Sequence, residues 1–504
     1  MFFNVTAGPL FSSAAFLLLF AVAAPSQENQ LALESQQAKQ LMSQGRFEEA
    51  IPLYRHLVNA VPGNPGLILN LGLAQEMAGR PADAVPQFEA VLKAQPDNVP
   101  ALTSLGMAQL QLNQPSRAIA PFQKLIAVQP DNRDARGMLA GALSTVGRSG
   151  EAAVQYRKLA AMDPGDAKAW YGLGKSYESL ASGAFDRLEK SAPESSYVLE
   201  LIGDSQVSRQ QYRSAFFFYK QAMEKMPSLR GVHSGLAEVY EKTGHADWAA
   251  AERRREQSLA LSTCQTQTAE CLFGRGKLLP AAQAGGKSPA SLLWAAKAYN
   301  VLALQAFDRL GELPESVEIH ALKAEISRGH RQYLEEANEW RAALKIAPGD
   351  TRLKHELMVA LFSAHDYQTL IPMLQAALNE HRDSAEDQFM LGTSLLRLQQ
   401  PEKSLPYLQS ALRKQPDMPA ADASLGMALA LINRPSDAIP HLEKALTLDE
   451  DGSLHYQLAR AFQAKGNTQR ARELMVQYQQ IQKQNQESKD EVAKEAQITA
   501  PSGK

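Results

Sequence analysis

The sequence has little cysteine and no surplus of basic charge. Only two cysteines occur among 504 residues, Cys264 and Cys271 in the stretch CQTQTAEC. A zinc site normally takes three or four ligands, and the stretch contains neither a CxxC motif nor a histidine, which disfavours a metal site. The 52 Lys and Arg residues are matched by 54 Asp and Glu residues, for a formal net charge of -2. Because nucleic-acid-binding proteins usually carry a basic surplus, this balance argues against that class.

The apolar run near the start is too short for a membrane span. Leu10 to Ala24 reads LFSSAAFLLLFAVAA, 15 residues where a spanning helix needs about 20. It ends in Ala21-Val22-Ala23, which fits the A-x-A cleavage rule and predicts a signal peptide over residues 1–23. No Lys or Arg precedes the run, and an uncleaved anchor or a misplaced start codon is the alternative. We expect an exported protein, periplasmic or extracellular, with no membrane span after cleavage.

Export affects the interpretation of the cysteine pair. In an oxidising compartment two cysteines this close together most often form a disulfide, so a bond between Cys264 and Cys271 is predicted. Two free thiols are the alternative, and a metal or catalytic role is the third.

Catalytic motifs are incomplete wherever they begin. His355-Glu356 opens HELMV, but no second histidine follows at the spacing that a zinc protease helix needs. The stretch GRGK, residues 274–277, lacks the rest of a phosphate-binding loop, and Ser234 lies in HSGLAE rather than in a GxSxG turn. The run Arg253-Arg254-Arg255 is interleaved with glutamates, which favours an ion-paired helix face over a nucleic-acid patch. We therefore predict no enzyme, cofactor or metal.

What the sequence does contain is a repeat of 34 residues. Four kinds of position recur at this interval: Pro62, Pro96, Pro130 and Pro164; Leu71-Gly72, Leu105-Gly106, Leu139-Ala140 and Leu173-Gly174; Ala50, Ala84, Ala118 and Ala152; Tyr54, Phe88, Phe122 and Tyr156. Within each unit, apolar residues at helical spacing form two stretches separated by a turn such as AGRPAD. One helical hairpin cannot bury its apolar face alone, so neighbouring hairpins must stack.

These positions resemble those of the tetratricopeptide repeat family, over about residues 31 to 484. The resemblance implies an all-α, tetratricopeptide-type helical-hairpin solenoid, a right-handed superhelix whose concave face is lined by the first helix of each pair. It implies a protein-binding scaffold, because the family binds protein segments on that face.

Two near-copies of one phrase interrupt the rhythm. SGAFDRLEKSAPES begins at Ser182, and LQAFDRLGELPES begins 122 residues later at Leu304. No turn signal separates the apolar positions around either phrase, which predicts one long helix in each copy, near 167–195 and 289–316. Gly183 leaves a kinked or broken helix as the alternative. The similarity continues downstream, so a module of one long helix plus several hairpins is predicted to occur twice.

The expected organisation has five parts. Residues 1–23 are the signal peptide, 31–263 a first repeat array, 264–288 a cysteine-containing join, 289–484 a second array and 485–504 a disordered tail. The join contains PAAQAGGKSP and is either a flexible hinge or a loop held by the disulfide. The tail is polar and nearly free of large apolar residues, which is typical of disorder.

The resemblance also implies which residues would contact a ligand. The family's ligand-facing positions are the second, fifth, sixth, ninth, twelfth and thirteenth of each repeat. They map here onto Leu69, Asn70, Leu73, Thr103, Met107, Lys168, Tyr171, Lys175, Phe389, Thr393 and Met427. Several are apolar, which favours an extended segment or an amphipathic helix as ligand. The alternative is that residues such as Leu73 and Met107 pack against their own second helices.

The expected function is a non-catalytic scaffold in a bacterial envelope assembly, with protein partners. A regulatory or carrier subunit of an envelope enzyme complex, in secretion, pilus or polysaccharide machinery, is the alternative.

Overall fold

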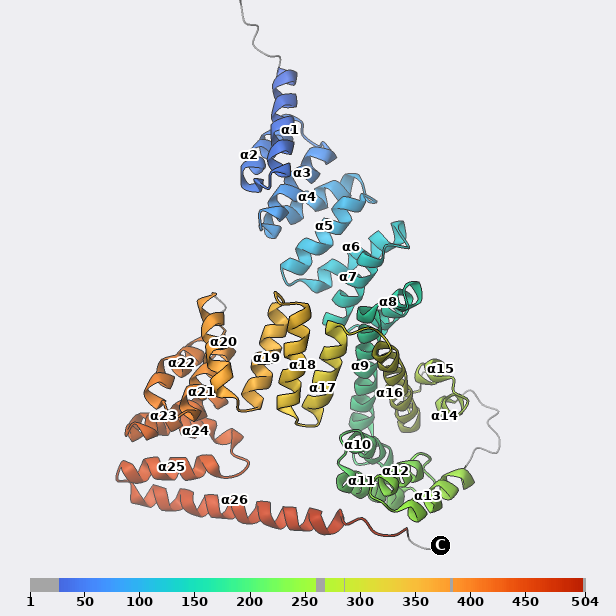
Figure 1. Ribbon diagram of the computed structural model, residues 1–504, viewed down its shortest axis with the longest axis vertical. Coiled ribbons are helices and arrows are strands. Elements are labelled where there is room, and N and C mark those ends of the chain that lie inside the picture. The colour runs from blue at the N-terminus through green and yellow to red at the C-terminus, as the bar shows by residue number, and fades with distance from the viewer. Residues whose placement is uncertain (1–26, 260–267, 285, 381–383, 502–504) are drawn as a thin grey trace, which may run out of the picture. The chain divides into compact units, whose positions relative to one another are not determined.

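The computed structural model describes residues 27–501 except 260–267, 285 and 381–383. Within these ranges every regular element is helical and no strand occurs (Figure 1). The chain divides into two compact units, unit 1 (Met1–Gly147) and unit 2 (Arg148–Lys504). The predicted all-α helical-hairpin solenoid is confirmed.

Unit 1 consists of helices joined by short turns, each packed on the next. They are α1 (Gln27–Ser43), α2 (Phe47–Ala60), α3 (Pro65–Met77), α4 (Pro81–Ala94), α5 (Val99–Gln111), α6 (Pro115–Val128) and α7 (Arg133–Thr145).

The repeat determines where these helices begin and how closely they pack. Asn64, Asn98 and Asn132 precede α3, α5 and α7, and each side chain accepts a hydrogen bond from a main-chain N–H of the first turn. Such a cap stabilises a helix by about 1 kcal/mol. Gly106 of α5 lies so close to Phe122 of α6 that an added Cβ would come within 2.5 Å of the ring. The small residue therefore allows the two helices of the pair to approach.

Unit 2 begins with α8 (Ser149–Met162), α9 (Ala167–Ser191), α10 (Ser196–Ser208), α11 (Tyr212–Lys225), α12 (Val232–Lys242), α13 (Ala246–Ser258), α14 (Ala269–Gly274) and α15 (Leu278–Ala282). It continues with α16 (Pro289–Gly311), α17 (Val317–Gly329), α18 (Tyr333–Ile346), α19 (Thr351–Ser363), α20 (Tyr367–Asn379), α21 (Ala385–Arg397) and α22 (Pro401–Lys414). It ends with α23 (Pro419–Leu431), α24 (Pro435–Ala445), the 3-10 turn η1 (Leu446–Leu448), α25 (Ser453–Ala464) and α26 (Thr468–Glu495).

The two long helices are present as predicted. α9 has 25 residues and α16 has 23. α9 continues through Gly183, so the alternative of a broken helix does not occur. Each long helix ends just before a proline, because the residue preceding a proline is disfavoured in helical conformation. These prolines are Pro193 and Pro314.

The two long helices pack against each other (Figure 1), which the sequence did not predict. Gly174, early in α9, meets Phe307, late in α16, so the helices run antiparallel. Tyr177 and Tyr299 stack with their ring centroids 6.0 Å apart. This contact joins the two copies of the duplicated module.

Equivalent positions of the two copies meet reciprocally. The stacked tyrosines occupy the same place in the repeated sequence, as do Lys175 and Lys297, and as do Asp204 and Glu325. Lys175 Nζ lies 3.0 Å from Glu325 Oε2, and Lys297 Nζ lies 3.0 Å from Asp204 Oδ2. Each long helix thus bridges to the first hairpin of the other copy. This is the isologous geometry of a two-fold dimer, formed here within one chain.

The described part of the cysteine-containing join is packed rather than a free hinge. Its helices α14 and α15 contact α16, where Leu272 and Ala281 are buried with Ala298. Cys271 is also buried, whereas Cys264 lies outside the described residues. The disulfide between them stays a prediction.

The predicted disordered tail is corrected for residues 485–501. α26 continues to Glu495, and its Asn485 side chain donates a 2.8 Å hydrogen bond to the carbonyl of Glu450. Residues 496–501 then lie against α12, where the Tyr240 hydroxyl donates to the carbonyl of Thr499 at 2.8 Å. A polar composition predicted disorder, but Glu, Lys, Gln and Ala are also strong helix formers. Residues 502–504 lie outside the described part.

Candidate functional site

The candidate site in unit 1 is a face formed by the first helix of successive pairs. This first-helix face consists of Leu69, Asn70, Leu73, Glu76 and Met77 on α3, Thr103 and Met107 on α5, and Gly137 and Gly141 on α7. The residues recur at matching positions of the 34-residue repeat, so they lie in register from helix to helix.

The predicted residues of this face divide into packed and accessible ones. Leu69 and Leu73 are half-buried and pack with the cluster around Phe88, the kind of contact that the alternative of ordinary helix packing predicts. Thr103 is half-buried, and its hydroxyl donates to the carbonyl of Val99 at 3.0 Å. Asn70 is half-buried, and Met107 keeps 36% of its surface exposed.

Three further features of the face were missed from the sequence. Met77 is 58% exposed, although large apolar side chains usually find cover. Burial raises the pKa of Glu76, against a hydrogen bond with Ser104 that lowers it. No atom lies within 4 Å of where a Cβ would be at Gly137 or Gly141, so a ligand main chain has room to approach α7. Glu76 and Met77 stand at the twelfth and thirteenth repeat positions, and Gly137 and Gly141 at the fifth and ninth. All four belong to the family's ligand-facing set, and that register was the available signal.

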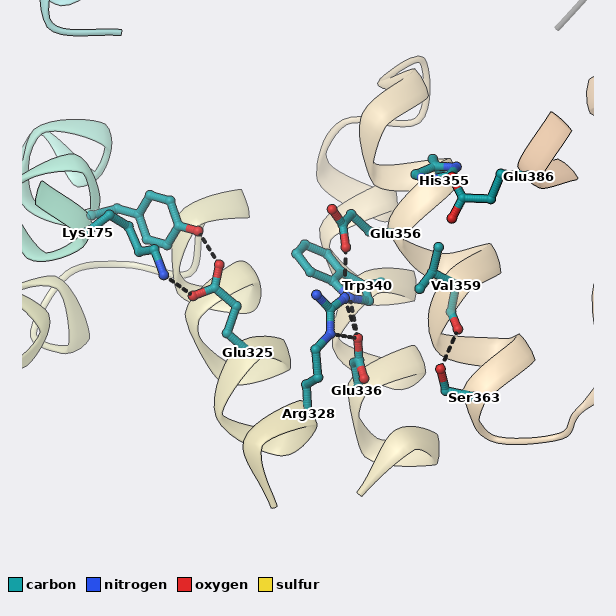
Figure 2. A network of polar contacts seen from close by, with 11 residues as sticks. Lys175, Glu325, Arg328, Glu336, Trp340, His355, Glu356, Val359, Ser363 and Glu386 are labelled. Carbon is teal, nitrogen blue, oxygen red and sulfur yellow. Dashed lines mark hydrogen bonds and ion pairs between the residues drawn. The ribbon is translucent and has the colours of Figure 1, made fainter. Parts of the chain in front are cut away.

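In unit 2 the predicted α9 residues are engaged within the fold (Figure 2). Tyr171 Oη donates to Glu325 Oε1 at 2.7 Å, and Lys175 Nζ donates to Glu325 Oε2 at 3.0 Å. Burial and the neighbouring Glu325 raise the pKa of Tyr171, which therefore stays protonated and donates. Lys168 is exposed. Tyr171 and Lys175 are thus bound to Glu325 within the fold, and their role as ligand contacts stays a prediction.

A charged strip follows from there across α17, α19 and α21 (Figure 2). It consists of Glu325, Arg328, His355, Glu356 and Glu386. The Arg328 guanidinium lies 2.8 Å from Glu356 and 2.6 Å from the buried Glu336, while His355 and Glu386 lie 3.8 Å apart. These pairs link α17 to α19 and α19 to α21. The side chains of His355 and Glu386 stay exposed to solvent.

The sequence contained a signal for the charged strip that the prediction did not use. Gly203 of the first copy corresponds to Ala324 of the second, which places Glu325 and Arg328 at the ninth and twelfth repeat positions. Both belong to the family's ligand-facing set.

The predicted residues nearer the C-terminus pack between helices. The Thr393 hydroxyl donates to Ser424 Oγ at 3.0 Å and is buried, so it joins α21 to α23. Phe389 lies against Phe362 with ring centroids 5.7 Å apart. Met427 is half-buried in the neighbouring apolar cluster. Thr393 is therefore not accessible to a ligand, whereas Phe389 and Met427 keep part of their surface exposed.

Two arginines of the run on α13 form ion pairs. Arg253 pairs with Glu241, and Arg255 Nη1 lies 2.6 Å from Glu252 Oε1. This is the helix face that the interleaved glutamates indicate.

Neither a metal centre nor a membrane helix emerges from the described ranges. No group of three or more His, Cys, Asp or Glu side chains is placed to hold a metal ion among residues 27–501 apart from the gaps. No helix in the same part of the chain is both long and apolar enough to cross a bilayer.

Comparisons with known proteins address the repeats themselves. Two family models described as tetratricopeptide repeat match the chain, one at residues 389–453 and the other at residues 41–105 and 76–143. A search of curated protein sequences gave no match.

Several solved structures are similar over parts of the chain. A tetratricopeptide repeat protein from Parabacteroides merdae is 13% identical, with 66% of this chain and 99% of that one covered and a TM-score of 0.31. MamA AMB-1 is 24% identical, with coverages of 30% and 83% and a TM-score of 0.29. YrrB, described as a TPR protein with an unusual peptide-binding site, is 20% identical, with coverages of 36% and 91% and a TM-score of 0.29.

The matched segments coincide with the capped helical pairs α2–α7 of unit 1 and with α21–α24 of unit 2. These matches and the hairpins that carry them identify tetratricopeptide repeats in both units of the chain.

Proposed function

We propose that the chain is a non-catalytic scaffold that holds an extended or helical segment of another protein on the first-helix face of unit 1. The observation that carries the proposal is the exposure of Met77 and Met107 beside Glu76 and the open positions over Gly137 and Gly141. Methionine side chains are flexible and polarisable, so they adapt to apolar side chains of a bound segment. The half-buried carboxyl of Glu76 would orient that segment by a hydrogen bond.

The proposal includes export to a bacterial envelope. It is supported by the run LFSSAAFLLLFAVAA with its A-x-A ending and by the closely spaced cysteine pair. A scaffold of stacked hairpins suits an assembly role, because each added repeat extends the binding surface without a new core.

Site-specific photocrosslinking tests the proposed face. Gln111, exposed at the end of α5 on the same face, is replaced by a photoreactive residue in the full-length protein, and the native envelope fraction is irradiated. We expect one protein to be crosslinked. The double variant Met77→Glu and Met107→Glu should reduce its yield at least about tenfold, because two buried charges would each oppose an apolar contact.

A matched control uses the second helices of the same unit. Val61 and Val128 are each 39% exposed, Val61 directly after α2 and Val128 at the end of α6, so neither belongs to a first helix. Val61→Glu with Val128→Glu should leave the crosslink unchanged. An unchanged crosslink in a folded Met77→Glu/Met107→Glu protein would contradict the proposal, as would the absence of any crosslinked protein. An envelope enzyme as the captured partner would instead favour a regulatory subunit.

A further inference from the structure

The C-terminal residues 496–501 bind a second surface, on the first copy of the duplicated module. Ile498 packs against an apolar cluster to which α11, α12 and α13 contribute together with neighbouring helices, and Ala496 is buried. The Tyr240 hydroxyl donates to the main-chain carbonyl of Thr499 at 2.8 Å. Gln497 and Ile498 line a cavity of about 990 Å³ with the start of α11 and with Thr243 and His245. We call the α11–α13 surface that receives these residues the tail site.

The tail site is built rigidly around Tyr240. Its ring lies 6.0 Å from that of Phe216 and 5.5 Å, edge to face, from that of Trp248, while His245 stacks on Trp248 at 4.1 Å. Burial raises the pKa of Tyr240 to about 12, so the hydroxyl keeps its proton and donates at physiological pH. A buried hydroxyl needs a hydrogen-bond partner, and Thr499 supplies it.

The contact has the features of peptide recognition. Residues 497–501 are non-helical, one branched side chain is packed, and the hydrogen bond is to a main-chain carbonyl. Such recognition takes affinity from the main chain and specificity from a single pocket. Any extended peptide with a branched apolar residue before a free carbonyl would satisfy the same groups.

The contacts of the docked segment are separated along α26 from those that α26 makes with α25. Residues 486–490 of α26 are exposed, between the part of α26 that packs on α25 and the docked segment. The docking therefore depends on few contacts, which a competing peptide can replace.

We propose that the tail site is a binding site for extended peptides and that residues 496–501 occupy it in cis as an internal competitor. The tether keeps the segment at a local concentration of the order of millimolar, so a free peptide binds only when its affinity or concentration exceeds that of the tail. This site is separate from the first-helix face of unit 1, and neither proposal depends on the other.

The test uses the full-length protein and a fluorescein-labelled synthetic peptide with the sequence of residues 495–501. In fluorescence anisotropy, Ile498→Glu should bind the peptide about tenfold more tightly than wild type, because the charged tail no longer competes. Adding Tyr240→Phe to that variant should weaken binding about fivefold, the effect of one lost hydrogen bond. A peptide carrying Ile498→Glu should not bind.

A control variant separates tail release from a general effect on α26. Val476→Glu places the same charge on an exposed position of α26, so it should bind the peptide as weakly as wild type does. Hydrogen exchange of α12 should increase in Ile498→Glu alone and return to the wild-type rate when peptide is added. Equal peptide binding by wild type and Ile498→Glu, or no binding by either, would overturn the proposal.

Discussion

Two kinds of glycine occur in the helices of unit 1. One kind lets the two helices of a hairpin approach closely, and the other faces open space. An added Cβ at Gly106 would lie 2.5 Å from the Phe122 ring, whereas Gly137 has open space around the same position. Gly106→Ala should therefore destabilise α5 and α6 by about 1–3 kcal/mol through overpacking. Gly137→Ala should instead stabilise α7 by about 0.5–1 kcal/mol, since alanine is the better helix former. Hydrogen exchange should become faster in α5 and α6 for Gly106→Ala and slower in α7 for Gly137→Ala. The same change in both variants would contradict the packing argument.

A buried histidine gives unit 2 a pH dependence. His233 Nδ1 lies 2.5 Å from Glu252 Oε2, and both residues are buried. The hydrogen bond to Glu252 raises the pKa of His233 above its ordinary value of 6.5, against burial that lowers it. A raised histidine pKa stabilises the fold fully below about pH 6.5, and the stabilisation is lost as pH rises through the folded pKa.

Titration of the histidine ring signals by NMR checks this pKa directly. The signal missing in His233→Gln should titrate above pH 6.5 in the wild-type protein. The urea midpoint of wild type should fall as pH rises through that value, while the midpoint of His233→Gln should not show this fall. A signal that titrates at or below 6.5 would refute the prediction.

For individual residues, the sequence predicted the position on a helix better than it predicted whether the side chain is packed or exposed. The resemblance to the repeat family put Leu69, Leu73 and Met107 on first helices of the hairpins, and the structure places them on α3 and α5. It did not separate the packed leucines from the exposed methionine, because that depends on the neighbouring hairpin. The engagement of Tyr171 with Glu325 was also beyond it, since the two residues are 154 positions apart.

Among the elements, the paired long helices carry two equivalent lysines with different surroundings. Lys297 lies 2.6 Å from Glu200, which is fully buried, whereas Lys175 and Glu325 are both partly exposed. Burial raises the pKa of Glu200, and the charge of Lys297 opposes that rise. Removing Lys297 would leave a buried carboxyl without its partner.

Lys297→Met should therefore destabilise unit 2 by about 3–5 kcal/mol. Lys175→Met should cost about 1 kcal/mol or less, because its ion pair is solvated. Urea unfolding of the two variants compares them, and the double variant Lys297→Met with Glu200→Leu should recover much of the loss. Equal destabilisation by the two single variants would refute the distinction drawn from burial.

The elements show what a repeat pattern can and cannot predict. Uninterrupted apolar spacing across Gly183 predicted a single helix, because helix continuity is a local property. The pairing of α9 with α16 was not predicted, since apolar spacing within one helix does not identify the distant helix that covers it. The docked tail was missed for a similar reason: its few contacts involve one branched residue and a main-chain carbonyl.

At the scale of the whole molecule, the proposed export predicts that the signal peptide is removed and that the two cysteines are oxidised to a disulfide. Protein purified from the envelope fraction should begin at Ala24, and peptide mapping without reductant should give one linked peptide containing Cys264 and Cys271. Intact Met1 together with two alkylatable thiols would contradict export. Protein made without residues 1–23 and kept in the cytoplasm is the matched control, and its cysteines should be reduced.

The closing contact of unit 2 has a consequence for the order of folding during synthesis. The main helix contacts of unit 1, in its described residues, are between near neighbours along the chain, so that unit can fold while later segments are still being made. Unit 2 requires α16 to reach α9, and its tail site fills in cis only when Thr499 reaches Tyr240, 259 positions earlier. Closing so long a loop carries an entropic cost and is slow compared with hairpin formation. Unit 2 therefore closes later in synthesis than unit 1 does.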